Sequence, residues 1–233
     1  MGLLFLAATA IILLGYARFA VAAAAALSER HTLVIDPGHG GLDGGASAAD
    51  GTKESGVNLS IALRMRDLCA LFGLPCEMTR TEETLPYPPE AVSVHEKKVW
   101  DQQRRLSGMR EAQDPVFLSI HQNFYPDERP RGIQVLYAAS EGSEQFGSVT
   151  HGNLLRCLCP ESRRVVMPAP RDIYLLKQAE CPAILVECGF LSNPTEAGLL
   201  TAASYQTKIA VILLASYLEY AQSAAPAQEA AFP

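Results

Sequence analysis

The sequence predicts a single α/β domain whose mostly parallel sheet is flanked by helices. Short runs of β-branched and aliphatic residues alternate along the chain with longer segments in which apolar residues recur at helical spacing. The strand candidates are continuous apolar runs, which is typical of strands buried on both faces of a parallel sheet. A length of 233 residues fits one domain of this class with short appendages.

The predicted strands are short apolar runs, the first of which ends at a Pro-Gly turn. They are His31–Asp36, Leu74–Thr79, Val116–His121, Ile133–Ala138 and Ala183–Glu187, with Ile173–Leu176 as a further candidate. A proline cannot donate a backbone hydrogen bond, so Pro75 places the second strand at an edge of the sheet.

Four segments are expected to form helices. In Val57–Phe72 the apolar residues recur every three or four positions, which predicts an amphipathic helix packed on the sheet by one face. The other three are Val94–Gln113, Gln145–Leu158 and Tyr205–Tyr220.

The two ends of the chain differ from the rest. No charged residue occurs from Met1 to Ala17, and an alanine-rich apolar block follows Arg18. An apolar block ahead of a polar junction is typical of a signal peptide or signal anchor, and a buried core helix is the less favoured interpretation. We expect residues 1–28 to form this N-terminal apolar helix, cleaved or retained, residues 29–220 to form the domain, and residues 221–233 to be a disordered tail.

This N-terminal segment predicts that the domain is extracytoplasmic, either secreted or anchored at the outer face of the cytoplasmic membrane. The formal net charge is −6, from 19 Lys and Arg against 25 Asp and Glu, and no block of the chain is rich in Lys and Arg. Phosphate backbones are bound by basic surfaces. Nucleic acid is therefore excluded as a partner.

Three predicted strands end in a side chain that can bind a metal or a proton, namely His39, His121 and Glu187. Glu54 adds a carboxylate just before the first helix. Because the carboxyl ends of parallel strands line one rim of the sheet, these groups can converge although they are distant in sequence. Two imidazoles and one carboxylate are the ligand set of a catalytic zinc site with an open position.

The segment from Asp36 to Gly45 contains five glycines in ten residues, which lets the backbone pass close to an ion or a ligand. A phosphate-binding loop is the competing interpretation, but the spacings of the known nucleotide-binding motifs are absent. Each ligand taken alone is more often structural, and only their joint occurrence favours a metal site. His31, His95 and His151 are expected to be structural or surface residues.

Five ordered motifs resemble those of the zinc-dependent N-acetylmuramoyl-L-alanine amidases of the amidase_3 type. They are Val34–Gly45 (VIDPGHGGLDGG), Glu54 with Asn58, Met78–Arg80 (MTR), Ser119–Asn123 (SIHQN) and Val186–Pro194 (VECGFLSNP), and the resemblance covers about His31 to Tyr220. It implies a six-stranded α/β sheet, zinc bound by His39, Glu54 and His121, and Glu187 as the catalytic residue. The implied substrate is peptidoglycan, cleaved between N-acetylmuramic acid and L-alanine.

A closer resemblance is to the germination-specific amidases, which prepare spore-cortex muramic acid for conversion to muramic-δ-lactam. The motifs Arg171–Leu176 (RDIYLL) and Phe190–Leu200 support it. This branch implies action in the cortex space of the forespore, and a lipoprotein partner as in some of its members. If the N-terminal segment is not cleaved, the membrane is a further partner.

The roles of several neighbouring residues stay open at this point. Asp36, Ser119 and Asn123 are candidates to orient the imidazoles, although Asn123 can equally brace its loop, and Arg171 is a candidate for a stem-peptide carboxylate or an exposed surface residue. Phe124 stands where the family usually has a small residue and can alter the rim of the site. The alternatives are a zinc hydrolase of another cell-wall amide, a deacetylase or peptidase, and a non-catalytic peptidoglycan-binding domain.

Overall fold

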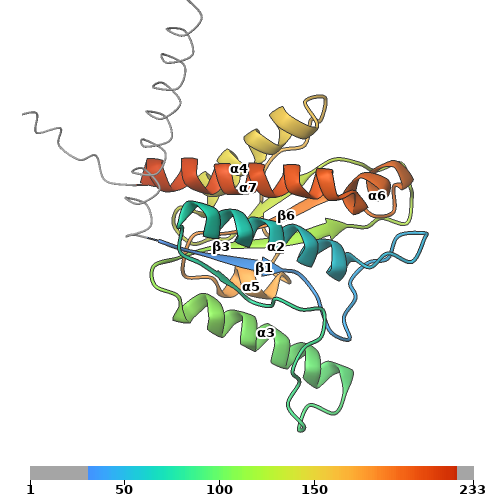
Figure 1. Cartoon of the computed structure of the whole chain (residues 1–233), viewed down its shortest axis with the longest axis vertical. Helices are drawn as coiled ribbons and strands as arrows, with labels where there is room; N and C mark the ends of the chain where they lie inside the picture. Colours follow the sequence, from blue (N-terminus) through green and yellow to red (C-terminus); the bar gives the residue numbers. More distant parts are fainter. Residues whose placement is uncertain (1–30, 225–233) are drawn as a thin grey trace, which may run out of the picture.

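The computed structural model describes residues 31–224, which form one six-stranded sheet with helices on both faces (Figure 1). The strands are β1 (Thr32–Pro37), β2 (Cys76–Met78), β3 (Pro115–Asn123), β4 (Gln134–Tyr137), β5 (Met167–Pro168) and β6 (Ala183–Phe190). The helices are α2 (Glu54–Phe72), α3 (Val94–Glu111), α4 (Ser143–Leu158), α5 (Tyr174–Gln178), α6 (Pro194–Thr201) and α7 (Ala203–Ala224). The predicted α/β class is confirmed.

The sheet order is β2-β1-β3-β6-β4-β5, with β2 at an edge as Pro75 predicts. All neighbouring strands are parallel except β4 and β6, which are antiparallel. In the parallel pair β3–β6, His121 lies beside Glu187. Directly paired residues of neighbouring strands point to the same face of a sheet, so these two side chains share one face.

Alternate residues of the central strands enter two separate cores. Ile35, Leu118 and Val186 belong to the larger core, which α2, α4 and α7 cover. Phe117 and Leu185 belong to the smaller core, on the opposite face of the sheet, which α3 and α5 cover (Figure 1). Successive side chains of a strand point to opposite faces of the sheet. His121 and Glu187 therefore lie on the face that α3 and α5 cover.

The structure corrects two sequence predictions. Ile173–Leu176 lies at the start of α5 and is not a strand, because a short apolar run does not by periodicity distinguish a strand from one buried helical turn. The predicted boundary at Tyr220 is four residues too early, since α7 continues to Ala224 and Ala221 is packed in the core. Alanine has the highest helix propensity, so large aliphatic residues are not needed to extend the helix.

Two short elements were not predicted, β5 and α6. Asn193 caps α6 by accepting a hydrogen bond from Glu196 N, and a proline occupies the first turn. The predicted apolar segment 1–28 and most of the predicted tail lie outside the described residues. Within residues 31–224, no single helix has the length and hydropathy to cross a bilayer, and only the bent pair α6–α7 meets these criteria jointly.

Candidate active site

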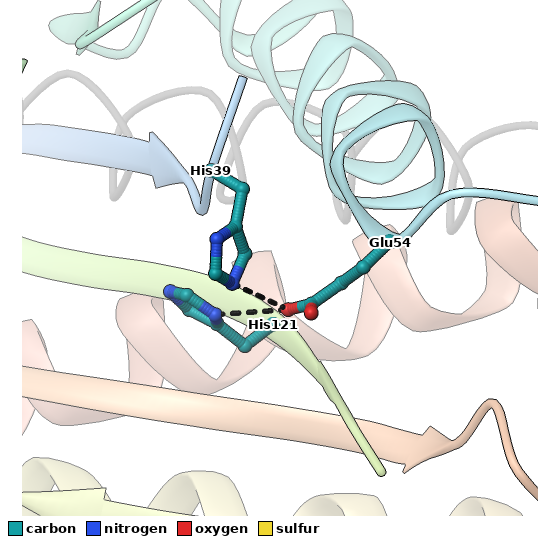
Figure 2. A group of neighbouring side chains, drawn as sticks. All are labelled: His39, Glu54 and His121. Carbon is teal, nitrogen blue, oxygen red and sulfur yellow. Dashed lines mark hydrogen bonds and ion pairs between the residues drawn. The ribbon is translucent and has the colours of Figure 1, made fainter. Parts of the chain in front are cut away.

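Three side chains from three segments converge at the carboxyl-terminal rim of the sheet (Figure 2). His39 follows β1, Glu54 begins α2, and His121 lies near the end of β3. Glu54 Oε1 is 3.2 Å from His39 Nε2 and 3.0 Å from His121 Nδ1. One possible ligand atom from each of the three residues lies within 4.8 Å of the other two, which suits a single divalent ion.

Two glycines make this approach possible. A Cβ atom at Gly38 would lie 2.3 Å from His121 Nε2, and one at Gly45 would lie 2.4 Å from Glu54 Oε2. His39 itself has a φ of 60°, a left-handed conformation that is uncommon for a residue with a side chain. The glycine-rich loop therefore lets the backbone pass close to His121 and Glu54.

Glu54 is nearly fully buried and accepts several hydrogen bonds. Its Oε1 atom accepts from Gln122 N at 3.1 Å and from Asn58 Nδ2 at 3.3 Å, and its Oε2 atom accepts from Ala46 N at 2.9 Å. Burial disfavours the carboxylate, but hydrogen bonds from His121 and His39 outweigh burial and hold the pKa of Glu54 well below its usual range. Its position in the first turn of α2 also favours a negative charge.

Asp43 orients His39, a role that the sequence analysis did not assign. Its Oδ2 atom lies 3.1 Å from His39 Nδ1 and 3.2 Å from Lys98 Nζ. Metal-binding imidazoles commonly donate their second N–H to a carboxylate, which fixes the ring and its tautomer. The four-residue spacing from His39 within the same loop was the signal in the sequence that could have identified Asp43.

The pKa of His39 predicts how metal binding depends on pH. Burial lowers it, but hydrogen bonds to Asp43 and Glu54 outweigh burial and raise the pKa of His39 to about 9. If His39 is a metal ligand, a proton on Nε2 competes with the ion, so metal affinity should rise with pH until His39 is neutral. Between pH 7 and pH 9 we expect an increase of up to about a hundredfold, at tenfold for each pH unit.

This pH dependence is measured by competition with a chromophoric chelator across the range. Asp43→Asn removes one of the groups that raise the pKa of His39, so its affinity curve should level off at a lower pH than that of the wild type. An affinity that does not change with pH would contradict the assignment of His39 as a ligand.

Glu187 has the properties of a group that exchanges protons near neutrality. Its Oε2 atom is buried and, among the described residues, has no hydrogen-bond partner. Burial is the main cause that raises its pKa to about 7, and the negative charge of Glu54 adds to the effect, while the imidazoles oppose it.

A cleft extends from the ligand group across the face of the sheet that carries His121 and Glu187. Its cavity volume is about 360 Å³. The floor is formed by Phe117, Ser119, His121, Leu185 and Glu187, one wall by α3 with Lys98, Asp101, Gln102 and Arg105, and the other wall by residues 172–176. We call this hollow the α3–α5 cleft. Glu187 and His121 therefore face the same cleft.

The chain matches the family profile described as "N-acetylmuramoyl-L-alanine amidase" over residues 33–216, which is most of its length. The chain belongs to this amidase family. The germination-specific N-acetylmuramoyl-L-alanine amidase of Bacillus subtilis is 32% identical over 189 residues, which cover 81% of this chain and 78% of that one. The family that the motifs predicted is thus confirmed.

Solved amidase structures share the fold. The CwlD amidase from Clostridioides difficile, solved in complex with the GerS lipoprotein, has a TM-score of 0.78 at 32% identity and covers 82% of this chain and 98% of that chain. The amidase AmiC2 of Nostoc punctiforme has a TM-score of 0.69 at 25% identity, covering 83% and 97%. The matched regions include every segment of the amidase site described above.

Asp36 lies beneath the amidase site, and a role in orienting an imidazole stays a prediction. Within residues 31–224, no hydrogen bond joins its carboxylate to either ring; it accepts instead from Thr79 Oγ1 at 2.6 Å and Ser119 Oγ at 2.7 Å. Arg105 NH1 pairs with it at 3.3 Å and Arg105 also donates to the backbone carbonyl of His39. Asp36 therefore ties β1, β2 and β3 to α3 below the metal ligands.

Replacing Asp36 with alanine should destabilise the amidase by about 3–5 kcal/mol, because Arg105 would lose one of its two carboxylate partners in a buried position. Urea unfolding followed by circular dichroism measures the effect. Asp67→Ala, at an exposed pair with Arg66, is the control and should change stability by less than about 1 kcal/mol. A loss at Asp36 no larger than at Asp67 would contradict this role.

The structure places the two remaining candidates outside the ligand group. Asn123 accepts a hydrogen bond from Leu191 N through its backbone carbonyl, which agrees with its alternative role of bracing the loop. Arg171 is exposed and precedes the wall of the α3–α5 cleft, whose lining residues begin at Asp172. Contact of Asn123 or Arg171 with substrate stays a prediction.

Proposed function

We propose that this amidase is a zinc enzyme of the spore cortex that hydrolyses the amide bond between N-acetylmuramic acid and L-alanine. The observation that carries the proposal is the convergence of His39 Nε2, Glu54 Oε1 and His121 Nδ1 beside Glu187. Similarity to a germination-specific amidase and to CwlD supports the cortex as the site of action.

The donor set fits zinc. Two imidazole nitrogens and one carboxylate oxygen are the ligands of open catalytic zinc sites, whereas calcium and magnesium prefer oxygen ligands alone. His39, Glu54 and His121 would hold the ion, and Asp43 would fix the His39 ring. Zinc bound there would acidify a water molecule and polarise the scissile carbonyl.

Glu187 performs the proton transfers in this proposal. Its carboxylate takes a proton from the attacking water, whose oxygen bonds to the lactyl carbonyl carbon as the C–N bond breaks. The same group then donates that proton to the departing alanine nitrogen. The products are a carboxylic acid on the glycan and an amine on the peptide, and at neutral pH the acid loses its proton and the amine becomes protonated. A pKa of about 7 lets one carboxyl group serve as both base and acid near neutral pH.

Peptidoglycan lies outside the cytoplasmic membrane, so the catalytic domain acts in an extracytoplasmic space. Residues 1–28 are proposed to direct the chain there as a cleaved signal or as a retained anchor, with residues 29–224 as the catalytic domain. CwlD was solved with the GerS lipoprotein, and we extend this to a lipoprotein partner for the present chain. Co-elution of the full chain with a GerS-type lipoprotein in size-exclusion chromatography tests the partner.

The reaction is tested by digesting cortex peptidoglycan with the zinc-loaded protein and analysing the products by mass spectrometry. We expect free peptides with an L-alanine amino terminus and intact glycan chains without stems. Glycan that has lost acetyl groups would indicate a deacetylase, shortened stems would indicate a peptidase, and an unchanged substrate would indicate a binding domain. Each of these three results contradicts the proposal.

A further inference from the structure

The residues His39 and Glu54 come from two separate segments of the chain (Figure 2), and the buried side chain of Arg80 binds the backbone of both segments. Its Nη2 atom donates one hydrogen bond to the Gly38 carbonyl at 3.0 Å and another to the Ser55 carbonyl at 2.8 Å. Gly38 directly precedes His39, and Ser55 directly follows Glu54. One guanidinium group therefore links the backbone beside one ligand to the backbone beside the other.

The backbone at His39 depends on such contacts, because its φ of 60° is unfavourable for a residue with a side chain. Arg80 Nε donates to the Pro37 carbonyl at 3.0 Å, so Arg80 binds both of the peptide groups that lead into His39. A Cβ atom at Gly40 would lie 2.8 Å from Arg80 Nε, so the glycine at this position leaves room for the guanidinium group. These hydrogen bonds offset the cost of the left-handed conformation.

Arg80 uses a different nitrogen atom for its ion pair. Its Nη1 atom donates to the Glu82 carbonyl at 3.1 Å and lies 3.4 Å from Oε2 of the half-exposed Glu83. A lysine at this position would keep the charge, but its ammonium group is a single point on a flexible stem and does not reproduce the planar set of donors. The carbonyl contacts therefore depend on the shape of the guanidinium group, whereas the pair with Glu83 depends on its charge.

We propose that Arg80 is a positioning residue of the metal site, which holds His39 and Glu54 at the spacing that a zinc ion requires by binding the backbone beside each of them. This inference rests on the proposed zinc site. Within residues 31–224, no hydrogen bond joins Arg80 to either ligand side chain, so it acts through the backbone. Ligands that are already held in place lose less conformational freedom when they bind an ion, which strengthens binding.

The test is the zinc affinity of the full chain carrying Arg80→Lys, measured by competition with a chromophoric chelator. We expect this variant to bind zinc about 10–100-fold more weakly than the wild type, which is the usual loss when a residue that supports metal ligands is replaced. Circular dichroism shows whether the variant is folded. If the lysine variant does not fold, Arg80→Gln provides the same measurement without burying a charge.

Two controls separate positioning from charge and from stability. Glu83→Gln removes the ion pair of Arg80 but leaves its bonds to the Gly38 and Ser55 carbonyls, so this variant should bind zinc as the wild type does. Leu154→Ala opens a cavity in the core beneath α4, which packs on β4, β6 and α7. It should lower the melting temperature by about 10 °C and leave the zinc affinity unchanged.

The outcomes also separate this inference from the proposed function. If the wild type does not bind zinc, the proposed metal site fails. If the wild type binds zinc and the folded Arg80 variant binds it equally well, the inference is wrong. A loss of affinity in Glu83→Gln as large as that in Arg80→Lys would show that the charge is what matters, and an equal loss in Leu154→Ala would show a general effect of instability. Either result also overturns the positioning role.

Discussion

Replacing Glu187 with glutamine is expected to lower amide hydrolysis by about 10²–10⁴-fold while the protein stays folded and binds zinc. Proton transfer by a positioned carboxyl group contributes 10²–10⁴-fold to such reactions, and glutamine has the same shape but does not exchange a proton. Glu187 lies beside His121 but its carboxylate is not among the three ligand groups, so the metal site should remain intact. Release of free L-alanine amino termini measures the activity.

The same variant should be at least as stable as the wild type. The pKa of Glu187 is raised to about 7 in the folded protein, so its ionised form costs stability as pH rises from the unfolded value through pH 7. Removing the charge should therefore add stability at pH 8, by at most about 3 kcal/mol for a shift of this size. Loss of zinc or a lower melting temperature would show that Glu187 has a structural role instead.

Replacing Glu54 with glutamine should weaken zinc binding by more than about a hundredfold and abolish activity with it. Loss of an outer partner of a metal ligand already costs 10–100-fold in affinity, and Glu54 is expected to be a ligand itself. The amide would also place its NH2 group opposite either Gln122 N or Ala46 N, two donors that the Glu54 carboxylate satisfies with separate oxygens. Elemental analysis of the purified protein gives the ratio of zinc to protein.

Glu83→Gln is the control for this variant. Glu83 is a nearby carboxylate that accepts a hydrogen bond from Ser55 Oγ and pairs with Arg80, without contact to either imidazole in the described part of the chain. It should bind zinc as the wild type does. A Glu54→Gln protein with an unchanged ratio of zinc to protein would remove Glu54 from the ligand set.

The sequence predicted those parts of the site that depend on where strands end. His39, His121 and Glu187 all follow or end buried strands, and the parallel arrangement of β1, β3 and β6 brings such positions to one rim. The position of Glu54 just before a helix is common for a structural carboxylate, so its assignment as a ligand depended on the family resemblance.

The network beneath the site could not be predicted in the same way. Arg105 comes from the middle of α3, and its distance in sequence from Asp36 gives no periodic signal that would bring the two together. The same holds for Lys98 and Asp172, which face one cleft only because α3 and α5 pack on the same face of the sheet. These contacts are determined by tertiary packing, which local patterns in a single sequence do not predict.

The antiparallel strand β4 has a consequence for the part of the rim opposite the α3–α5 cleft. β4 runs antiparallel to β6, so the segment 124–133 between β3 and β4 leaves the sheet and rejoins it at the same rim. Phe124, at the start of this segment, is 49% exposed. Hydrogen bonds tie this segment to the region after β6: Tyr125 N donates to Ser192 Oγ, Asn193 Nδ2 donates to the Glu128 carbonyl, and Gly132 N donates to Glu196 Oε1. An insertion at this loop would leave every strand register unchanged and cost little closure entropy. Residues can therefore be added at this loop, by natural variation or by protein engineering, while the strands that carry His121 and Glu187 keep their register.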